Sequence, residues 1–520
     1  MTAASHILSF ADVLAAARQG DAAISSHSGR TGRGDIFVSL PKAVRIEPQG
    51  PEGPGGPDYS GAEAHLLQAI AAGAGYVVCT DAVWARTLPG LDAAPGSSPS
   101  ASSGAGVFRG AALVPDTREA LGQLAAVHYG TDASRVKLLA VTGTNGKTTS
   151  TYLLEAVLRH AGYTPGVIGT VEYRWPGHAE ESPLTTPGIA TLHEMVAAMG
   201  RAGADCGIME VSSHAIEQNR IAGLPFSGAL YTNLSQDHLD YHRDMEEYFS
   251  VKARFFLQNS PLTIPDPALA ANIDDPYGLR LFKANPAVLG YAFSGPGERI
   301  LSGTVLEQGR DGLRLRMEYS GAAWELTSPL VGQFNAYNLL GAQALALAMG
   351  LDVGHMRALA AVTGVPGRLE RVPNDRDLAV FVDYSHTPDA LVKALQALRG
   401  ASFSRIITVF GCGGDRDRAK RPMMGEAAAT YSDVAVLTSD NPRTEDPLRI
   451  MADVKPGLAR ARKVIEEVDR RKAIGLALEE LRPGEALLIA GKGHEPYQII
   501  GTTKYPFSDQ QVVREYLGCA

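Results

Sequence analysis

The stretch from Leu138 to Ser150, which reads Leu-Leu-Ala-Val-Thr-Gly-Thr-Asn-Gly-Lys-Thr-Thr-Ser, constrains the fold of this chain more than any other segment. An apolar run of strand length enters a glycine-containing turn, and residues 152–160, which have the pattern of a helix, follow it. This order places backbone N–H groups and the positive end of a helix dipole around one anion. The sequence therefore predicts a nucleotide-phosphate loop between a strand and a helix.

The polar residues of the loop fit this chemistry. Lys147 can reach the β- and γ-phosphates as a point charge, and the Thr148 hydroxyl can complete the shell of a Mg²⁺ ion between them. The general pattern G-x-x-x-x-G-K-[ST] begins with glycine, where this chain has Val141. The alternative is a glycine-rich turn that binds nothing, but a Lys-Thr pair at the start of a helix favours phosphate. The predicted phosphate-binding residues are Gly143, Thr144, Asn145, Gly146, Lys147, Thr148 and Thr149.

Length and charge narrow the class of protein. A chain of 520 residues is too long for one core, so several domains are expected. A formal charge of −8 argues against a nucleic-acid partner. We find no apolar run of the roughly 20 residues that span a bilayer, and no signal-peptide pattern at the N-terminus. The four cysteines lack metal-ligand spacing, which suits a reducing compartment. We expect a cytoplasmic enzyme that does not bind membranes.

The N-terminal segment has a mixed α/β pattern. Helices are expected at 8–19 and 62–72, and strands at 35–39 and 76–79. Residues 48–57 and 91–106 are rich in Gly, Pro, Ser and Ala, and we expect them to form mobile surface loops.

Two candidate metal ligands follow strands of the predicted central sheet. Glu210 lies in the apolar run 207–211, and His238 lies shortly after the run 230–233. Because the carboxyl ends of parallel strands form the ligand crevice, both side chains are expected beside the phosphate loop. Each alone fits equally well as a structural cap of its loop. Together with Lys147 and Thr148 they favour a metal-nucleotide site.

The rest of the chain predicts a parallel sheet through residue 350, decorated by hairpins at 299–330, and then a second doubly wound domain. Asn335 and Asn338, at the start of an Ala/Leu-rich helix, are helix caps or adenine contacts. Four buried strands at 378–383, 405–410, 434–438 and 486–490 each lead into a polar loop. The Gly411-x-Gly413 start of one loop does not fit a dinucleotide fingerprint, because Arg416 stands where that motif needs glycine.

Six blocks of sequence together resemble the Mur ligases, and within that family the MurE type, which acts on UDP-N-acetylmuramoyl-L-alanyl-D-glutamate in cell-wall synthesis. The resemblance covers nearly the whole chain. The blocks are Thr142–Thr149, Glu210–His214, Asn233–Asp240, Gly367–Glu370, Asp383–Pro388 and Gly491–Glu495. It implies an α/β fold of three domains: a mixed α/β UDP-substrate domain (1–134), a P-loop ATP domain with a parallel sheet (135–352) and a Rossmann-like amino-acid domain (353–520).

The resemblance also implies an ATP-dependent amide ligase that acts as a monomer with two Mg²⁺ ions. The D-glutamyl side-chain carboxylate would attack the γ-phosphate, and an amine would attack the resulting acyl phosphate. Metal ligands would be Thr148, Glu210, His238 and Lys252, the last as a carbamate. From the residues alone, Lys252 is only a lysine of an amphipathic helix. Catalysis would rest on Lys147, Glu210, His238 and Lys252.

Matched positions of the family assign the remaining contacts. Asn335, Asn338, Arg368 and Asp383 would contact ATP. Ser28, Thr185, Thr186, Ser213, Gln218 and Arg220 would hold the UDP-muramoyl-dipeptide. Around Ser28 the chain has His27-Ser28-Gly29 where the family usually has Asp-Ser-Arg, which puts the uridine contacts in question.

The added amino acid is predicted from the loop Asp440-Asn441-Pro442-Arg443, which resembles enzymes that add meso-diaminopimelate. An arginine fork suits the extra carboxylate of that substrate. The predicted contacts are Arg416, Asp440, Asn441, Pro442, Arg443, Gly491 and Glu495. Alternatives are a solvent-exposed turn arginine at position 443, a ligase that adds L-lysine or L-ornithine, a sister ligase that adds a dipeptide, and a P-loop protein that uses ATP only as a switch.

Overall fold

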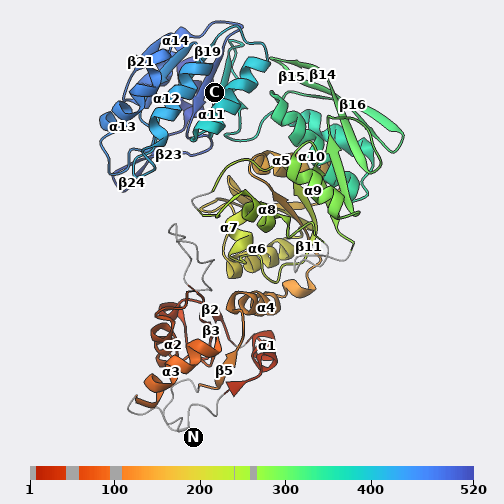
Figure 1. Ribbon diagram of the computed structural model, residues 1–520, viewed down its shortest axis with the longest axis vertical. Helices are drawn as coiled ribbons and strands as arrows, with labels where there is room; N and C mark the ends of the chain where they lie inside the picture. Colours follow the sequence, from red (N-terminus) through yellow and green to blue (C-terminus); the bar gives the residue numbers. More distant parts are fainter. Residues whose placement is uncertain are drawn as a thin grey trace. The chain divides into compact units, whose positions relative to one another are not determined.

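The computed structural model describes residues 7–20, 22–41, 58–93, 108–238, 241–257 and 266–519, and Figure 1 traces the chain through them. The chain divides into two compact units. The first unit comprises Met1–Lys147, Gly162–Leu269 and Arg280–Val288, and the second comprises Thr148–Ala161, Ala270–Leu279 and Leu289–Ala520.

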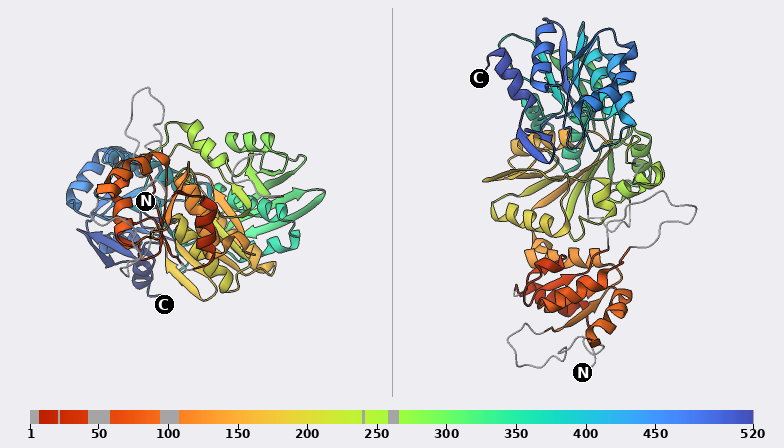
Figure 2. Two further views of the ribbon diagram at one scale, coloured as in Figure 1. Left: turned by 90° about the horizontal axis from the view of Figure 1, so that it is seen from below. Right: turned by 90° about the vertical axis from the view of Figure 1, so that its left-hand side faces the viewer.

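The N-terminal part of the first unit is a parallel sheet with helices on both faces. Its elements are β1 (Ile7–Leu8), α1 (Phe10–Arg18), β2 (Ile24–Ser25), η2 (Ser28–Arg30), β3 (Ile36–Val38), α2 (Ala62–Ala71), β4 (Tyr76–Cys79), α3 (Asp81–Ala93), β5 (Gly110–Leu113), α4 (Thr117–Tyr129) and η3 (Thr131–Ala133). The strand order is β1-β5-β4-β3-β2. Tyr76 and Val78 pack with α1 and α4, whereas Val77 and Cys79 pack with α2 and α3. Figures 1 and 2 show the sheet between these helices.

The predicted helices and strands of this segment are confirmed, with ends shifted by one or two residues. The predicted loop 91–106 is wrong at its start, because residues 91–93 complete α3. Their place in the helix was hidden by composition, since Pro89 and Gly90 precede them. Residues 94–106, and the whole predicted loop 48–57, lie outside the described residues.

The rest of the first unit is built on a second sheet. Its elements are β6 (Lys137–Thr142), β7 (Pro165–Ile168), β8 (Glu172–Trp175), β9 (His178–Glu181), α6 (Ile189–Arg201), β10 (Cys206–Glu210), α7 (Ser213–Glu217), β11 (Phe226–Tyr231) and α8 (Met245–Ala253). The strand order is β11-β6-β10-β7-β8-β9. The neighbours from β11 to β7 are parallel, as predicted. β8 and β9 are antiparallel, which the prediction missed, because Gly177 (φ 76°) closes a tight hairpin there.

The phosphate-loop helix α5 (Lys147–His160) belongs to the second unit from Thr148 on, and so do most residues of the elements that follow β11 and α8; Ala268, Leu269 and Arg280–Val288 belong to the first unit. These elements confirm the predicted hairpins. They are β12 (Ala268–Asn272), α9 (Pro276–Ala284), β13 (Val288–Ala292), β14 (Ile300–Gly309), β15 (Gly312–Tyr319), β16 (Ala322–Ser328), α10 (Gln333–Ala348) and η4 (Val353–Ala361). β14, β15 and β16 pair antiparallel. Gly332 is the N-cap residue of α10, so Asn335 and Asn338 are not its caps.

The C-terminal sheet is doubly wound, as predicted. Its elements are β17 (Glu370–Arg371), β18 (Ala379–Asp383), α11 (Pro388–Gly400), β19 (Ile406–Phe410), α12 (Lys420–Tyr431), β20 (Val434–Leu437), α13 (Pro447–Val454), η5 (Lys455–Arg460), β21 (Val464–Glu466), α14 (Arg470–Glu480), β22 (Ala486–Ala490), β23 (Tyr497–Ile500), β24 (Thr503–Pro506) and α15 (Asp509–Leu517). The order β17-β18-β22-β19-β20-β21 is parallel except for β17.

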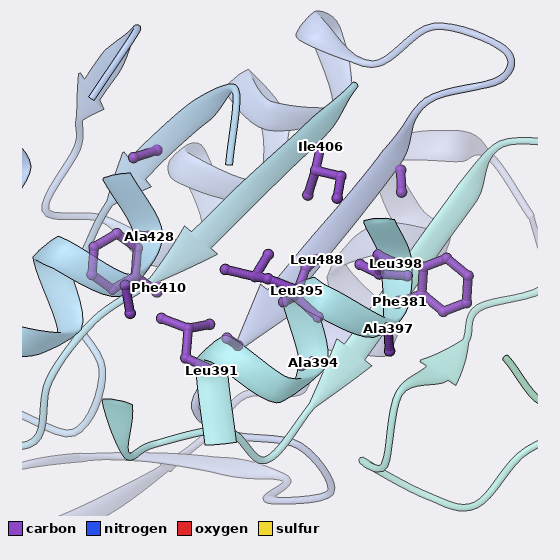
Figure 3. Packing of buried hydrophobic residues seen from close by; sticks show 14 of the residues in the cluster. Phe381, Leu391, Ala394, Leu395, Ala397, Leu398, Ile406, Phe410, Ala428 and Leu488 are labelled. Carbon is purple, nitrogen blue, oxygen red and sulfur yellow. The ribbon is translucent and has the colours of Figure 1, made fainter. Parts of the chain in front are cut away.

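Alternate residues of these strands face two separate cores. Phe381, Phe410 and Leu488 pack against α11 and α12, and Figure 3 shows Leu391 and Leu395 of α11 on this face. Val382 and Ile489 pack on the opposite face with α14 and α15. Because these strands are parallel, the carboxyl ends of β18, β19, β20 and β22 lie at one edge, where the polar loops begin. Among the described residues, we find no helix with the length and apolarity needed to cross a membrane.

Candidate active site

The phosphate loop begins where β6 ends. Gly143 has φ 144° and Gly146 has φ 86°, conformations that side chains rarely adopt. A Cβ atom on Gly143 would lie 1.9 Å from Oγ1 of Thr232. That threonine hydroxyl donates to the carbonyl of Asn145 at 2.6 Å. The glycines therefore let the loop pass close to the end of β11, and Val141 does not disturb it because it is a buried residue of β6.

Lys147 folds back over this loop. Its Nζ donates to the carbonyl oxygens of Gly143 at 3.0 Å and Thr144 at 2.9 Å. The backbone N–H of Asn145 in turn donates to Oδ1 of Asn233 at 3.1 Å, from the segment that follows β11. The ammonium group is thus held at the mouth of the loop.

Glu210 lies at the carboxyl end of β10, in register with Val141 of β6. The side chain is buried, and its two carboxylate oxygens accept from the N–H of Thr170 at 2.8 Å and from the hydroxyl of Thr170 at 2.9 Å. The expectation that Glu210 stands at the same sheet edge as the phosphate loop is confirmed by this register.

Lys252 is in α8 but does not lie on an exposed helix face. It is 1% exposed, and its Nζ donates to the carbonyl of Gly143 at 3.0 Å. The ammonium also lies 4.8 Å from the ring centre of Tyr248. Burial, and then the positive charge of Lys147, hold the pKa of Lys252 well below its usual range. The interpretation of Lys252 as a simple surface lysine of an amphipathic helix is therefore wrong.

His238 has φ 54°, and its side chain is 44% exposed. Its ring lies 4.8 Å from that of His214, and Nε2 lies 3.6 Å from a carboxylate oxygen of Asp237. No group of three or more His, Cys, Asp or Glu side chains in the described part of the chain is arranged to hold a metal ion. A metal-ligand role for His238 stays a prediction.

Four of the six residues matched to muramoyl-dipeptide binding, Thr185, Thr186, Gln218 and Arg220, contact each other or the surroundings of Glu210. Thr185 Oγ1 lies 3.1 Å from Oγ1 of Thr170, and Thr186 Oγ1 donates to the carbonyl of Glu210 at 2.9 Å. Arg220 donates to the carbonyl of Thr186 at 3.1 Å and to Oε1 of Gln218 at 2.7 Å. The structure therefore connects Thr186, Gln218 and Arg220 through hydrogen bonds, and it connects Thr186 directly and Thr185 through Thr170 to Glu210.

Ser28 borders a separate cavity of about 290 Å³ in the N-terminal sheet, lined by Ser26, His27, Ser28, Phe37, Ser39, Leu40, Ala62 and His65. Its hydroxyl donates to Oε1 of Gln68 at 2.8 Å and lies 3.3 Å from Nδ1 of His65. Sequence reasoning missed His65 and Gln68, because a helix residue gives no local signal of its contact with a residue far away in the chain, here Ser28.

In the second unit, Arg368 reaches the start of α5. Its Nη2 donates to Oγ1 of Thr148 at 3.2 Å, and its guanidinium lies 5.2 Å from the ring centre of Tyr384. Asp383, at the end of β18, accepts from the N–H of Leu369 at 2.6 Å and from the Ser385 hydroxyl. Burial raises the pKa of Asp383 above its usual value.

Asn335 and Asn338 are buried on α10. Asn335 Nδ2 donates to the carbonyl of Val331 at 2.9 Å, and Asn338 Nδ2 donates to Oδ1 of Asn335 at 3.1 Å. The two amides thus form a fixed pair. A role in binding adenine stays a prediction.

The candidate amino-acid loops meet at one edge of the C-terminal sheet. Arg443 has φ 50°, and its Nη1 donates to the carbonyl of Gly414 at 2.8 Å. Its backbone is bridged to the β23–β24 hairpin, because its N–H donates to Ile499 O at 3.1 Å and its carbonyl accepts from Gly501 N at 2.7 Å. Arg416 is exposed, and its Nη1 donates to the carbonyl of Asp415. Arg443 is therefore a fixed residue, not a free turn arginine.

Lys492 is a buried lysine of the Gly491–Glu495 block, and it contacts the same loops. It was not predicted as a site residue. Lys492 Nζ donates to Oδ1 of Asn441 at 2.8 Å and lies 3.8 Å from carboxylate oxygens of Asp440 and Glu495. Asn441 Nδ2 donates to Glu495 at 2.9 Å. Burial raises the pKa of Glu495 and lowers the pKa of Lys492.

Gly491 and Pro442 complete this group. Gly491 has φ 118°, and a Cβ there would lie 2.3 Å from Oδ2 of Asp440. Pro442 is buried, and a Cβ on Gly414 would meet its carbonyl oxygen at 1.9 Å. The predicted residues 440–443, 491 and 495 are thus neighbours. Positions 414 and 491 have no room for a side chain, so both require glycine.

Two family descriptions match the parts of the chain that carry these residues. "Mur ligase middle domain" matches residues 141–346, and "Mur ligase, glutamate ligase domain" matches residues 367–493. The chain belongs to the Mur ligase family, and it is an ATP-dependent ligase that forms an amide bond. This membership decides against the alternative of a P-loop protein that uses ATP only as a switch.

The chain is also similar to individual ligases that share one description. A "UDP-N-acetylmuramoyl-L-alanyl-D-glutamate--2,6-diaminopimelate ligase" of Lawsonia intracellularis is 53% identical over 78% of this chain and 84% of its own length. A protein of the same description from Gloeobacter violaceus is 44% identical over 95% of this chain and 94% of its own. A solved structure of a ligase with that description has a TM-score of 0.65 and 31% identity, and the match covers 95% of this chain and 94% of that one.

Proposed function

We propose that this ligase joins meso-diaminopimelate to the D-glutamyl side-chain carboxylate of UDP-N-acetylmuramoyl-L-alanyl-D-glutamate, with conversion of ATP to ADP and phosphate. The observation that carries the proposal is the guanidinium of Arg443, which is held on the Gly414 carbonyl and belongs to the same loop as Asn441, the partner of Lys492 and Glu495. It is supported by the similarity to ligases described as acting on this pair of substrates. The reaction would supply a precursor of peptidoglycan.

The chemistry follows from groups around the phosphate loop. The substrate carboxylate attacks the γ-phosphorus of ATP, ADP leaves, and an acyl phosphate forms. The amine then attacks the acyl carbon, a proton leaves the nitrogen, and phosphate is released. Lys147 and the loop N–H groups offset the charge that develops on the transferring phosphoryl group. Arg368, which reaches Thr148, adds a second cation on the same strand-to-helix junction.

The metal site is proposed from the chemistry of its donors. Thr148, Glu210, His238 and a carbamate on Lys252 would hold Mg²⁺, which supplies Lewis acidity toward the phosphates. A buried carboxylate and a hydroxyl are oxygen donors of the kind that Mg²⁺ prefers. The Lys252 amine has the property that carbamylation needs, because only an unprotonated amine adds CO₂ and its low pKa favours that form.

Selection of the amino acid is proposed to rest on charge. The distal carboxylate of diaminopimelate would accept two parallel hydrogen bonds from Arg443, and its distal ammonium would lie against Glu495. A buried carboxylate whose pKa is raised by burial gains from such a cation. Lysine and ornithine lack the second carboxylate and would leave the half-buried Arg443 without that charged partner.

The other parts of the proposal follow the family. Residues 1–134 would bind the UDP-substrate, with the cavity at Ser28 as its uridine site, and residues 135–352 and 353–520 would bind ATP and the amino acid. His27 stands where the family usually has an acidic residue beside this serine. The polar side chains in contact with Ser28 are His65 and Gln68. We expect a monomer in the cytoplasm with no nucleic-acid partner.

The test is release of ADP by purified protein with ATP and Mg²⁺, omitting one substrate at a time. The proposal predicts turnover only when both the UDP-muramoyl-dipeptide and diaminopimelate are present, with an amide product of the expected mass. Steady ADP release without an amine would contradict it.

A further inference from the structure

Tyr241 and His242, which follow the predicted metal-ligand segment, contact two of the side chains proposed to hold the muramoyl-dipeptide. Nε2 of His242 lies 3.0 Å from the Ser213 hydroxyl. Nε2 of Gln218 donates to the Tyr241 hydroxyl at 3.0 Å. His242 is 2% exposed, so it is itself shielded from ligand and solvent.

We infer that His242 and Tyr241 are positioning residues, which fix the orientation of Ser213 and Gln218 for the muramoyl-dipeptide. The inference rests on the proposed function, which supplies that ligand. Neither residue was assigned a role from the sequence, because both are aromatic side chains whose partners, Ser213 and Gln218, are more than 20 positions away in the chain.

The argument for His242 starts from the freedom of a serine hydroxyl. A hydroxyl has one hydrogen and two lone pairs and rotates to suit its partners. A buried imidazole nitrogen at 3.0 Å takes up one of these positions, so it restricts the rotation of the Ser213 hydroxyl. Burial lowers the pKa of His242, so the ring is neutral and the contact does not place a second cation next to Ser213.

The hydrogen bonds of Tyr241 fix the orientation of the Gln218 amide. Its hydroxyl donates to a carboxylate oxygen of Glu217 and accepts from Gln218. Oε1 of Gln218 accepts from Arg220, which also donates to Thr186. Because the amide must offer its nitrogen to Tyr241 and its oxygen to Arg220, only one of its two flipped orientations satisfies both partners.

His242 is connected to the phosphate loop through Tyr248. The His242 ring stacks on Tyr248 with centroids 5.0 Å apart and an interplanar angle of 26°. The Tyr248 hydroxyl lies 3.1 Å from Oγ1 of Thr144 in the loop. A variant that keeps an aromatic ring at position 242 therefore keeps this stacking and removes only the contact with Ser213.

The experiment compares His242→Phe, His242→Gln, Tyr241→Phe and Ser213→Ala with the wild-type chain, and uses Tyr319→Phe on β15 as a matched control. We would measure the dissociation constant of UDP-N-acetylmuramoyl-L-alanyl-D-glutamate by calorimetry, KM for that substrate and for ATP, and the thermal midpoint. A lost hydrogen bond predicts about tenfold weaker dipeptide binding for His242→Phe and for Tyr241→Phe. KM for ATP and the thermal midpoint should change little, and Tyr319→Phe should match the wild type.

A double variant distinguishes a positioning role of His242 from general damage to the fold. The double variant Ser213→Ala/His242→Phe should bind no more weakly than the weaker single variant, and His242→Gln, which restores a side-chain nitrogen, should recover part of the loss. Multiplicative effects in the double variant, or an equal rise in KM for ATP, would overturn the inference. If the wild-type chain does not bind the dipeptide, the proposed function fails and the inference falls with it; normal binding by both position-242 variants overturns the inference alone.

Discussion

Nζ of Lys252 and the carbonyl oxygen of Gly143 lie 3.0 Å apart, so a residue of α8 meets the first residue of the phosphate loop directly. The contact brings two amines, Lys252 and Lys147, to the same carbonyl oxygen. Burial and this neighbouring charge are the reasons why the pKa of Lys252 is low. The lowered pKa favours the uncharged amine, which is the form that the proposed carbamylation requires.

The first prediction concerns this carbamate. With ¹³C-bicarbonate, the wild-type chain should show a carbamate carbon signal by NMR that Lys252→Ala lacks. Because only the unprotonated amine reacts and its pKa is lowered, the signal should persist at neutral pH, where an ordinary lysine is protonated. Lys252→Ala should lose activity on the order of 10²-fold, as expected for loss of charge stabilisation at the phosphoryl group. An unlabelled wild-type chain with full activity in CO₂-free buffer would exclude the carbamate.

The second prediction concerns the close approach of the loop to β11. Gly143→Ala places a Cβ 1.9 Å from Thr232 Oγ1 in a backbone conformation that alanine avoids, so the loop must move. ATP binding, measured by calorimetry, should weaken by more than tenfold. Gly309→Ala is the matched control, because a Cβ there meets nothing within 4 Å. Normal ATP binding by Gly143→Ala would show that the loop does not need this conformation.

The third prediction concerns stability and pH. His193 is fully buried; Nε2 lies 2.9 Å from the carbonyl of Ala222, and Nδ1 lies 2.5 Å from the Thr131 hydroxyl. Since Nε2 faces an acceptor it carries the hydrogen, and a proton on Nδ1 would displace the threonine donor. Burial lowers the pKa of His193 below 6.5 in the folded chain.

The sign of the effect follows from linkage. The unfolded chain takes up a proton near pH 6.5 while the folded chain does not, so the free energy of unfolding should fall as pH drops below about 6.5. Urea unfolding between pH 7.5 and 5.5 should show a smaller fall in His193→Gln, whose side chain does not titrate. An equal fall in the free energy of unfolding with pH in both chains would contradict a contribution from His193.

The fourth prediction concerns two ion pairs between the same helices, α14 and α15. Arg470 and Asp509 are both fully buried and joined at 2.6 Å, whereas Arg471 and Glu515 are about half exposed. Asp509→Ala leaves the Arg470 charge buried without that partner and should lower the free energy of unfolding by about 3–5 kcal/mol. Glu515→Ala, the matched control, should have little effect. Similar denaturation midpoints for the two variants would contradict the distinction.

The sequence predicted most of what local pattern controls. The strands at 76–79 and 486–490 and the phosphate-loop helix were expected from apolar runs and from Lys-Thr at the helix start. The register of Glu210 beside the loop followed from parallel strands ending at one edge. The strands and the helix depend on residues that are adjacent in the chain, so short windows contain that information.

Features that depend on distant partners were missed. Nothing near Lys252 indicates that its helix turns this lysine inward against the Gly143 carbonyl, and nothing near Lys492 indicates its contacts with Asn441 and Glu495. The contacts of His242 and Tyr241 also join segments that only the folded sheet brings together. The antiparallel β8–β9 hairpin was missed because each strand has only four residues and β9 carries no large apolar residue.

The most direct test of the central claim is the ratio of kcat/KM for meso-diaminopimelate to that for L-lysine, in the wild-type chain and in Arg443→Ala. L-ornithine serves as a second amine without a distal carboxylate. The wild-type ratio should exceed about 100, and Arg443→Ala should reduce it by at least tenfold through loss of diaminopimelate turnover, because a bidentate charged contact contributes about 1.5–3 kcal/mol. A wild-type preference for lysine or ornithine, or an unchanged ratio in Arg443→Ala, would contradict the assignment of this loop as the reader of the distal carboxylate.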